Sequence, residues 1–260
     1  MSVIDDIRNG TLGIKNIVAV AGGKGGVGKS TVTVNLAIAF AKRGYKTAVL
    51  DADIYGPTIP SFFCIYDRPM MMDGKLQPVE KNGVKIMSLG LVLTGYSVVD
   101  WSGSRITEVL KQFITGTNWG EIDIMLIDMP SGTGDMPQAI CRSLPLKCAI
   151  IVTTTQATAA KTAARTASLF RNMSVYVLGA VTNMSYMICD SCGKKKTVFP
   201  GGAESLLKKE AGIDVIAELP FYNGFMEEIN PGEVQNIEID KIASRDFDGL
   251  AKKILKVCLL

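Results

Sequence analysis

Gly23-Lys24-Gly25-Gly26-Val27-Gly28-Lys29-Ser30 is the most telling stretch of this chain. It matches the phosphate-binding pattern G-x-x-x-x-G-K-[ST], in which glycines let the backbone approach phosphate oxygens closely. The apolar run at residues 17–21 precedes it and predicts a buried parallel strand. Apolar residues then recur at helical spacing over residues 32–41, before Gly44 ends the helix. Strand, loop and helix together predict a binding site for a nucleoside triphosphate.

The loop residues have separate expected tasks. Backbone N–H groups of the loop and of the helix N-terminus should face the phosphates. Lys29 should reach the β- and γ-phosphates, and the Ser30 hydroxyl should bind Mg²⁺. Lys24 is a second lysine, directly after the first glycine, and indicates a particular branch of this large group. The expected nucleotide-binding residues are Gly23, Lys24, Gly25, Gly26, Val27, Gly28, Lys29, Ser30 and Thr31.

Composition limits the remaining classes of function. The chain has 260 residues, of which 47% are hydrophobic, and this predicts a single α/β domain over residues 1–260. A net charge of +3 gives no reason to expect a nucleic-acid surface. No apolar run has the roughly 18 residues of a membrane span, and residues 1–6 lack the apolar block of a secretory signal. We therefore expect a cytoplasmic protein with reduced cysteines and no stable membrane association.

Apolar strands alternate with helical patterns along most of the chain. This alternation predicts a doubly wound, mostly parallel sheet flanked by helices. Residues 57–95 contain four prolines and are expected to form a long irregular connection with one hairpin. The expected strands are 46–50, 122–127, 149–152, 175–181 and 215–219, and the expected helices are 105–113, 158–170, 203–209 and 246–259.

Polar side chains follow three of the expected strands. Asp51, Asp128 and Asn183 come at strand ends, where ligands gather in such sheets. Asp51 and Asp53 are two residues apart, so in an extended segment both carboxylates would face the γ-phosphate. One would hold Mg²⁺ through water and the other would orient the attacking water. The chain has no histidine, so acid–base chemistry falls to carboxylates, lysine, tyrosine or water.

Cys189 and Cys192 form a C-x-x-C turn followed by three lysines, which should favour thiolates. Two ligands are too few for zinc or an iron–sulfur cluster, both of which take four. A two-fold dimer would supply the missing pair, since each chain lends two thiolates to a shared centre. Metal or cluster binding, redox chemistry and an ordinary turn all remain open at this point. The other four cysteines stand alone in apolar surroundings and are expected to be small core residues.

These residues together resemble the Mrp/ApbC family of iron–sulfur cluster carrier ATPases, within the deviant Walker A class that includes MinD and ParA. The resemblance covers the chain from about Ile14 to its C-terminus. Its most specific pieces are Asp51-Ala52-Asp53-Ile54-Tyr55-Gly56-Pro57 and Ile127-Asp128-Met129-Pro130-Ser131-Gly132-Thr133-Gly134-Asp135. Asn183-Met184-Ser185 and the Cys189-x-x-Cys192 turn complete it.

The resemblance implies a role for each matching residue. Lys24 would cross to the partner chain's nucleotide in an ATP-bound homodimer. Asp53 would position the hydrolytic water, and Asp51 and Asp128 would act through Mg²⁺. Asn183 would read the adenine.

The resemblance also implies a cargo. Cys189 and Cys192 would bridge a labile [4Fe–4S] cluster between two subunits, for delivery to apoproteins that need it. The family usually has proline after the first cysteine, and here that position is Asp190. A negative charge there would weaken the hold on an anionic cluster, or alter the function.

Two further departures from the family pattern occur. Ser131 stands where a second proline is usual, and Trp101-Ser102-Gly103-Ser104 replaces Trp-Arg-Gly-Pro. The competing hypothesis is a MinD/ParA-like positioning ATPase that binds a membrane or protein partner without a metal. The amphipathic segment at residues 247–260 would serve that function, although we expect it to pack on the sheet. Zinc in place of a cluster is a further alternative, and a metabolic enzyme has the least support.

Overall fold

The computed structural model describes residues 2–53, 56–92, 103–189, 191–199, 201–221 and 241–259. Several sequence features named above lie outside these ranges. They are Ile54 and Tyr55 of the acidic motif, Trp101 and Ser102 of the tryptophan motif, and Asp190 of the cysteine turn.

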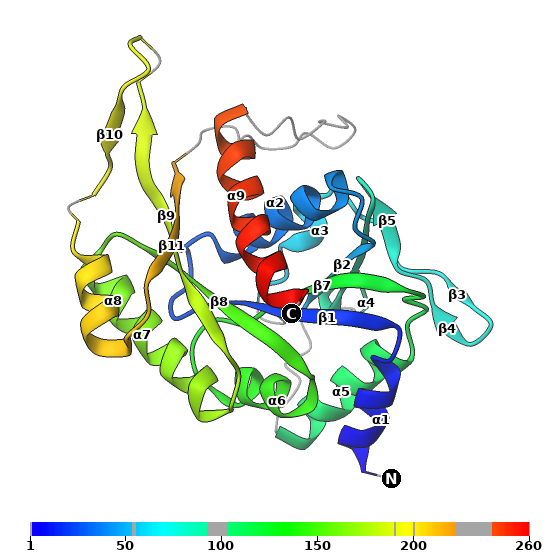
Figure 1. Cartoon of the computed structure of the whole chain (residues 1–260). Helices are drawn as coiled ribbons and strands as arrows, with labels where there is room; N and C mark the ends of the chain where they lie inside the picture. Colours follow the sequence, from blue (N-terminus) through cyan, green and yellow to red (C-terminus); the bar gives the residue numbers. More distant parts are fainter. Residues whose placement is uncertain are drawn as a thin grey trace.

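A mostly parallel sheet forms the centre of the molecule (Figure 1). Within the described residues it has nine strands, in the order β10-β9-β8-β1-β7-β2-β6-β5, with β11 also paired to β9. Only β5 and β10 run antiparallel to their neighbours. The strands are β1 (Ile14–Gly22), β2 (Thr47–Asp51), β5 (Val79–Lys81), β6 (Val84–Ser88), β7 (Ile122–Asp128), β8 (Leu146–Thr154), β9 (Val177–Ile188), β10 (Lys195–Thr197) and β11 (Val215–Pro220).

Helices cover both faces of this sheet (Figure 1). One hydrophobic cluster joins the sheet to α1, α5, α6, α7 and α8, and a second joins it to α2, α3 and α9. The central strands β2, β7 and β8 are largely buried on both faces for this reason, as in other covered parallel sheets. The helices are α1 (Val3–Gly10), α2 (Lys29–Lys42), α3 (Ile59–Phe62), α4 (Leu89–Val92), α5 (Gly103–Thr115), α6 (Asp135–Ser143), α7 (Ala157–Asn172), α8 (Ala203–Ala211) and α9 (Lys241–Cys258).

The fold class predicted from the sequence is confirmed, but two local expectations are wrong. Residues 57–95 do hold a hairpin, β3 (Met71–Met72) with β4 (Lys75–Leu76), yet they also contribute a strand of the main sheet. That strand, β6, pairs in parallel with β2 and sets Ser88 beside Asp51. Strand β9 continues to Ile188, so Asn183 lies inside a strand and not at its end.

The C-terminal helix packs on the sheet, as expected. Phe247, Leu250, Ala251 and Ile254 of α9 are buried in the cluster that also contains α2. No helix among the described residues has the length and apolar character needed to cross a membrane. Cys141, Cys148 and Cys258 are buried as expected, and Cys64 is half-buried.

Candidate functional site

The glycine-rich loop connects β1 to α2 and lines a cleft of about 270 Å³. Gly28 precedes the helix in the left-handed conformation, with φ of +82°. A Cβ on Gly28 would lie 2.1 Å from Asn183 Nδ2, so only glycine fits. Gly25 also lines the cleft and has open space where a Cβ would be. Lys24 and Thr31 also line the cleft, and Lys24 is exposed.

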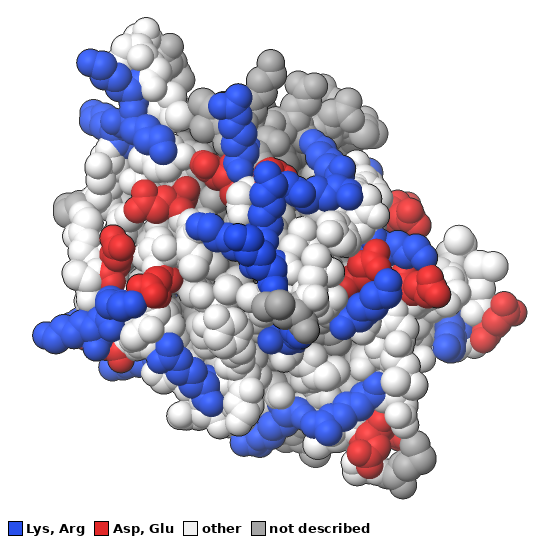
Figure 2. Space-filling view, viewed as in Figure 1, with Lys and Arg blue, Asp and Glu red and all other residues white. Residues whose placement is uncertain are grey.

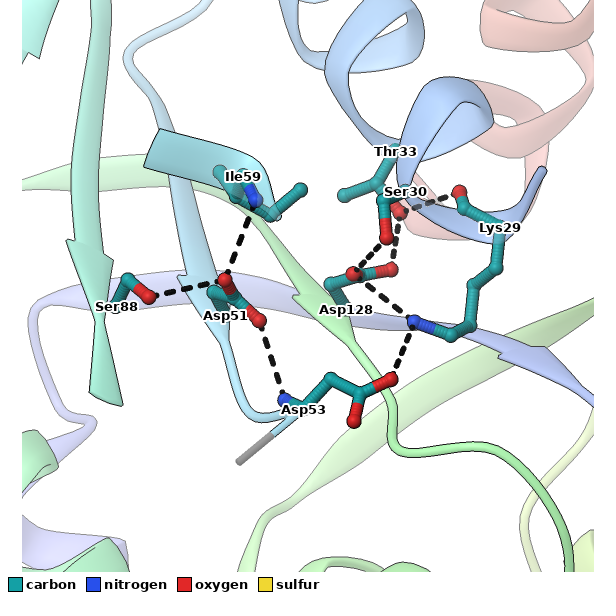
Figure 3. A network of polar contacts seen from close by, with 8 residues as sticks. All are labelled: Lys29, Ser30, Thr33, Asp51, Asp53, Ile59, Ser88 and Asp128. Carbon is teal, nitrogen blue, oxygen red and sulfur yellow. Dashed lines mark hydrogen bonds and ion pairs between the residues drawn. The ribbon is translucent and has the colours of Figure 1, made fainter. Parts of the chain in front are cut away.

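Lys29 lies at the centre of the site, with 8% of its side chain exposed (Figure 3). Its Nζ is 2.9 Å from Asp128 Oδ2 and 3.4 Å from Asp53 Oδ2. Nζ donates no hydrogen bond in this geometry although it is buried. Burial raises the pKa of Asp53, and the charge of Lys29 opposes that shift. A buried ammonium with donors to spare, in a cleft lined by the loop glycines, is a suitable receptor for phosphate oxygens.

Asp128 is fully buried at the end of β7 and is held from both sides (Figure 3). Ser30 Oγ donates to its Oδ2 at 2.7 Å, and Thr33 Oγ1 donates to its Oδ1 at 2.8 Å. Thr33 is a site residue that the sequence motifs do not include, although its place one helical turn after Lys29 is a usable signal. Ser30 and Asp128 thus lie side by side. A hydroxyl and a carboxylate oxygen are ligand types that Mg²⁺ takes, and the Mg²⁺ site itself stays a prediction.

Asp51 faces a different direction from the one expected. Its carboxylate accepts hydrogen bonds from Ser88 Oγ at 2.9 Å and from the backbone N–H groups of Asp53 and Ile59 at 3.2 and 3.3 Å. Burial, and then the negative charge of Asp128, raise its pKa to about 7. Only Asp53 of the pair reaches Lys29, so the expectation that both carboxylates share one direction is wrong. Asp51 thus binds the backbone at Asp53 and at Ile59.

Asn183 contacts the phosphate loop. Its Nδ2 donates to the Val27 carbonyl at 3.0 Å, and the residue is buried. Strand β9 therefore contacts the phosphate loop directly. The predicted contact of Asn183 with adenine remains a prediction.

Cys189 and Cys192 lie at the tip of the hairpin formed by β9 and β10, which projects from the body of the molecule (Figure 1). Both thiols are exposed. Cys189 N donates to the Lys194 carbonyl at 3.0 Å, and Gly193 N donates to the Cys189 carbonyl at 2.8 Å. Gly193 closes this turn in the left-handed conformation, with φ of +65°. The hairpin thus presents a sulfur pair away from the core.

The turn stabilises one thiolate. The backbone N–H groups of Cys192 and Ser191 are the main causes that lower the pKa of Cys189. Backbone N–H groups, and not the lysine charges that the sequence suggested, are thus the largest causes of this shift in pKa. Within the described residues, no group of three or more Cys, Asp or Glu side chains could hold a metal ion. The sulfur pair therefore lacks further protein ligands in that part of the chain.

The fold and the glycine-rich loop together define the class of protein. It is a P-loop NTPase with a second lysine beside the first glycine of the loop. Comparison with known proteins then gives the family. The chain belongs to the ParA family described as NUBPL iron-transfer P-loop NTPase, which matches residues 13–255. The resemblance drawn from the sequence motifs is confirmed.

Individual relatives agree with this assignment. The iron–sulfur cluster carrier protein of Haemophilus influenzae is 39% identical over 246 residues, which are 93% of this chain and 66% of that protein. The chain thus spans about two thirds of that relative's length. A nucleotide-binding protein from Archaeoglobus fulgidus, solved in complex with ADP, is 32% identical with a TM-score of 0.70, over 96% of this chain and 92% of that one. MinD of Pyrococcus furiosus has a TM-score of 0.67 at 21% identity, over 94% of this chain and 99% of that one, and shows the shared fold alone.

Proposed function

We propose that this protein is an ATP-hydrolysing carrier that assembles a [4Fe–4S] cluster, or transfers it to apoproteins, as a homodimer. The observation that carries the proposal is the exposed pair Cys189 and Cys192, which has an activated thiolate but too few ligands for a complete site. Two such pairs, related by a two-fold axis, make the four-thiolate shell that a cluster needs. The carrier names of relatives support the same cargo.

We propose further that the cleft beside the glycine-rich loop binds Mg²⁺ and ATP. When bound, Mg²⁺ would neutralise charge between the β- and γ-phosphates, and Ser30 and Asp128 are the residues that would hold it. Lys29 would exchange its carboxylate partners for phosphate oxygens. Asp53, released from Lys29, would orient the attacking water. Lys24 is exposed at the rim of the cleft and would reach the nucleotide of the second subunit.

Strand β9 supports a connection between the two halves. Asn183 contacts the phosphate loop at 3.0 Å, and Cys189 follows six residues later, directly after the same strand. A change at the loop would thus be transmitted along a continuous strand to the hairpin. The ATP cycle would alter the geometry of the dimer and the strength with which it holds the cluster. Free thiols at an exposed tip require a reducing compartment such as the cytoplasm.

The proposal is tested by anaerobic reconstitution with iron and sulfide. The wild-type chain should become brown and hold about one cluster per two chains. Cys189→Ala and Cys192→Ala should stay colourless while they bind ATP with unchanged affinity. Cys141→Ala, a buried cysteine far from the hairpin in sequence, is the control and should still take up a cluster. A colourless wild-type protein, or a brown Cys189→Ala/Cys192→Ala double variant, would contradict the proposal.

A further inference from the structure

The cysteine hairpin has two different faces. Its register sets Lys196 opposite Met187, and the hydrogen bond from Cys189 N to the Lys194 carbonyl extends this pairing to the turn. Opposed residues of an antiparallel pair share a face, and successive residues alternate between faces. Lys194 and Lys196 therefore lie on the face of Cys189, and all three side chains are exposed.

Lys195 lies on the other face. The register sets it opposite Ile188, and its Nζ lies 3.9 Å from the centroid of the Tyr186 ring. Tyr186 is two residues before Ile188, so it shares that face, and the cation–π contact confirms the alternation independently. Figure 2 shows Lys and Arg side chains gathered over this hairpin, at the upper left of the molecule. Lys194 and Lys196 thus share a face of the hairpin with Cys189, and Lys195 lies on the opposite face.

We propose that Lys194 and Lys196 are the cations that hold the anionic cargo between two copies of this chain, and that Lys195 has no part in it. The inference rests on the proposed cluster-carrier function and adds a determinant of cluster retention. An iron–sulfur core held by four thiolates is a net anion, and charges near its sulfurs tune it. Four lysines, two from each hairpin, would compensate that charge.

The same lysines make pairing of the hairpins depend on the cargo. Without a cluster, two hairpins that approach each other bring like charges together, and they repel. A bound cluster places negative charge between them and reverses the sign of the interaction. Backbone N–H groups are the largest causes that lower the pKa of the Cys189 thiol, so the lysines are left to act on the bound cluster. Their effect should therefore appear in the loaded dimer and be absent from the apo chain.

Two double variants test this with equal changes of charge. Lys194→Gln/Lys196→Gln removes the cations on the cysteine face, and Lys195→Gln/Lys209→Gln removes one from the opposite face and one exposed lysine of α8. Each full-length variant is reconstituted anaerobically, and cluster loss to a ferrous chelator is followed by visible absorbance. Sedimentation velocity measures the dimer fraction. Alkylation of the apo chains with iodoacetamide should proceed at equal rates and shows that the turn is intact.

At low ionic strength we expect the Lys194→Gln/Lys196→Gln variant to lose its cluster about tenfold faster than wild type, with fewer dimers. The control pair should stay within about twofold of wild type. At about 1 M salt the difference should largely vanish, because screening then acts within about 3 Å. Equal rates of cluster loss from the two double variants, or a difference that salt leaves unchanged, would overturn the inference. The carrier function would still stand in that case, because the wild-type chain binds a cluster. A wild-type chain that takes up no cluster overturns both.

Discussion

Replacing Asp53 with alanine should separate nucleotide binding from hydrolysis. In this structure Asp53 is an ion-pair partner of Lys29, with Oδ2 3.4 Å from Nζ and only 16% of the side chain exposed. Lys29 must leave this partner to hold the β- and γ-phosphates. Removing the carboxylate also removes a negative charge that would repel the triphosphate. The variant should therefore bind ATP more tightly while it loses the group that orients the attacking water.

The ion-pair distance sets the size of the effect on binding. Unit charges 3.4 Å apart attract by about 5 kcal/mol at an effective dielectric constant of about 20. Desolvation of both groups offsets most of that energy, and Asp128 remains as a second partner of Lys29. We therefore expect the Asp53 carboxylate to weaken ATP binding by about 1 kcal/mol. This corresponds to roughly fivefold tighter ATP binding. Loss of a positioned acid–base group should slow hydrolysis by about 100-fold or more.

Titration with a fluorescent ATP analogue gives the dissociation constant, and single-turnover phosphate release gives the hydrolysis rate. Glu121→Ala is the matched control, because it removes a carboxylate from an exposed ion pair with Lys46. It should change neither quantity by more than about twofold. Lys29→Ala should abolish binding. An Asp53→Ala protein with unchanged turnover, or with weaker ATP affinity, would refute the reasoning.

Three further outcomes are expected. Gly28→Ala should abolish nucleotide binding, since its Cβ would lie 2.1 Å from the side-chain amide nitrogen of Asn183 in β9. Gly44→Ala is the control: at φ of +84° in open space it should cost about 1–2 kcal/mol of stability and leave binding intact in calorimetric titration. Iodoacetamide near neutral pH should label Cys189 before Cys141, because the turn lowers the pKa of Cys189 and burial raises that of Cys141 to about 12; equal labelling in peptide mass spectra would contradict this. The pKa of Asp51 is about 7 in the folded chain, against an ordinary value of 3.8. Between these values the folded form keeps a proton that the unfolded form has released, so stability falls as pH rises. Asp51→Asn should lack this decline, which is on the order of 4 kcal/mol, and denaturant-unfolding free energies that change with pH equally in the two proteins would contradict the assignment.

Much of the nucleotide site could be predicted from the sequence because its signals are local. The glycines, Lys29 and Ser30 lie in one contiguous stretch, and Asp128 directly follows an apolar run at residues 124–127. The direction of Asp51 could not be predicted. The spacing rule for Asp51 and Asp53 holds for extended chain, but here the backbone turns so that Asp53 N donates to the Asp51 carboxylate.

Features that depend on pairing between distant segments could not be predicted from the sequence either. Strand β6 is short and lies in a proline-containing segment, and only its pairing with β2 shows that Ser88 supports Asp51. The length of β9 was underestimated because Asn183 reads as a residue after a strand, whereas pairing with β8 and β11 continues the strand through it. The two faces of the lysine triplet follow only from the hairpin register.

Native mass spectrometry of the reconstituted protein is the most direct test of a cluster shared between subunits. We expect the reconstituted sample to contain one species of two chains with four iron and four sulfide ions. The apo sample should not contain this species. Mixing wild-type chains with a Cys189→Ala/Cys192→Ala variant should give no loaded mixed dimer, because such a pair offers only two thiolates from its hairpins. A cluster carried by a single chain, or by a mixed dimer, would contradict the account.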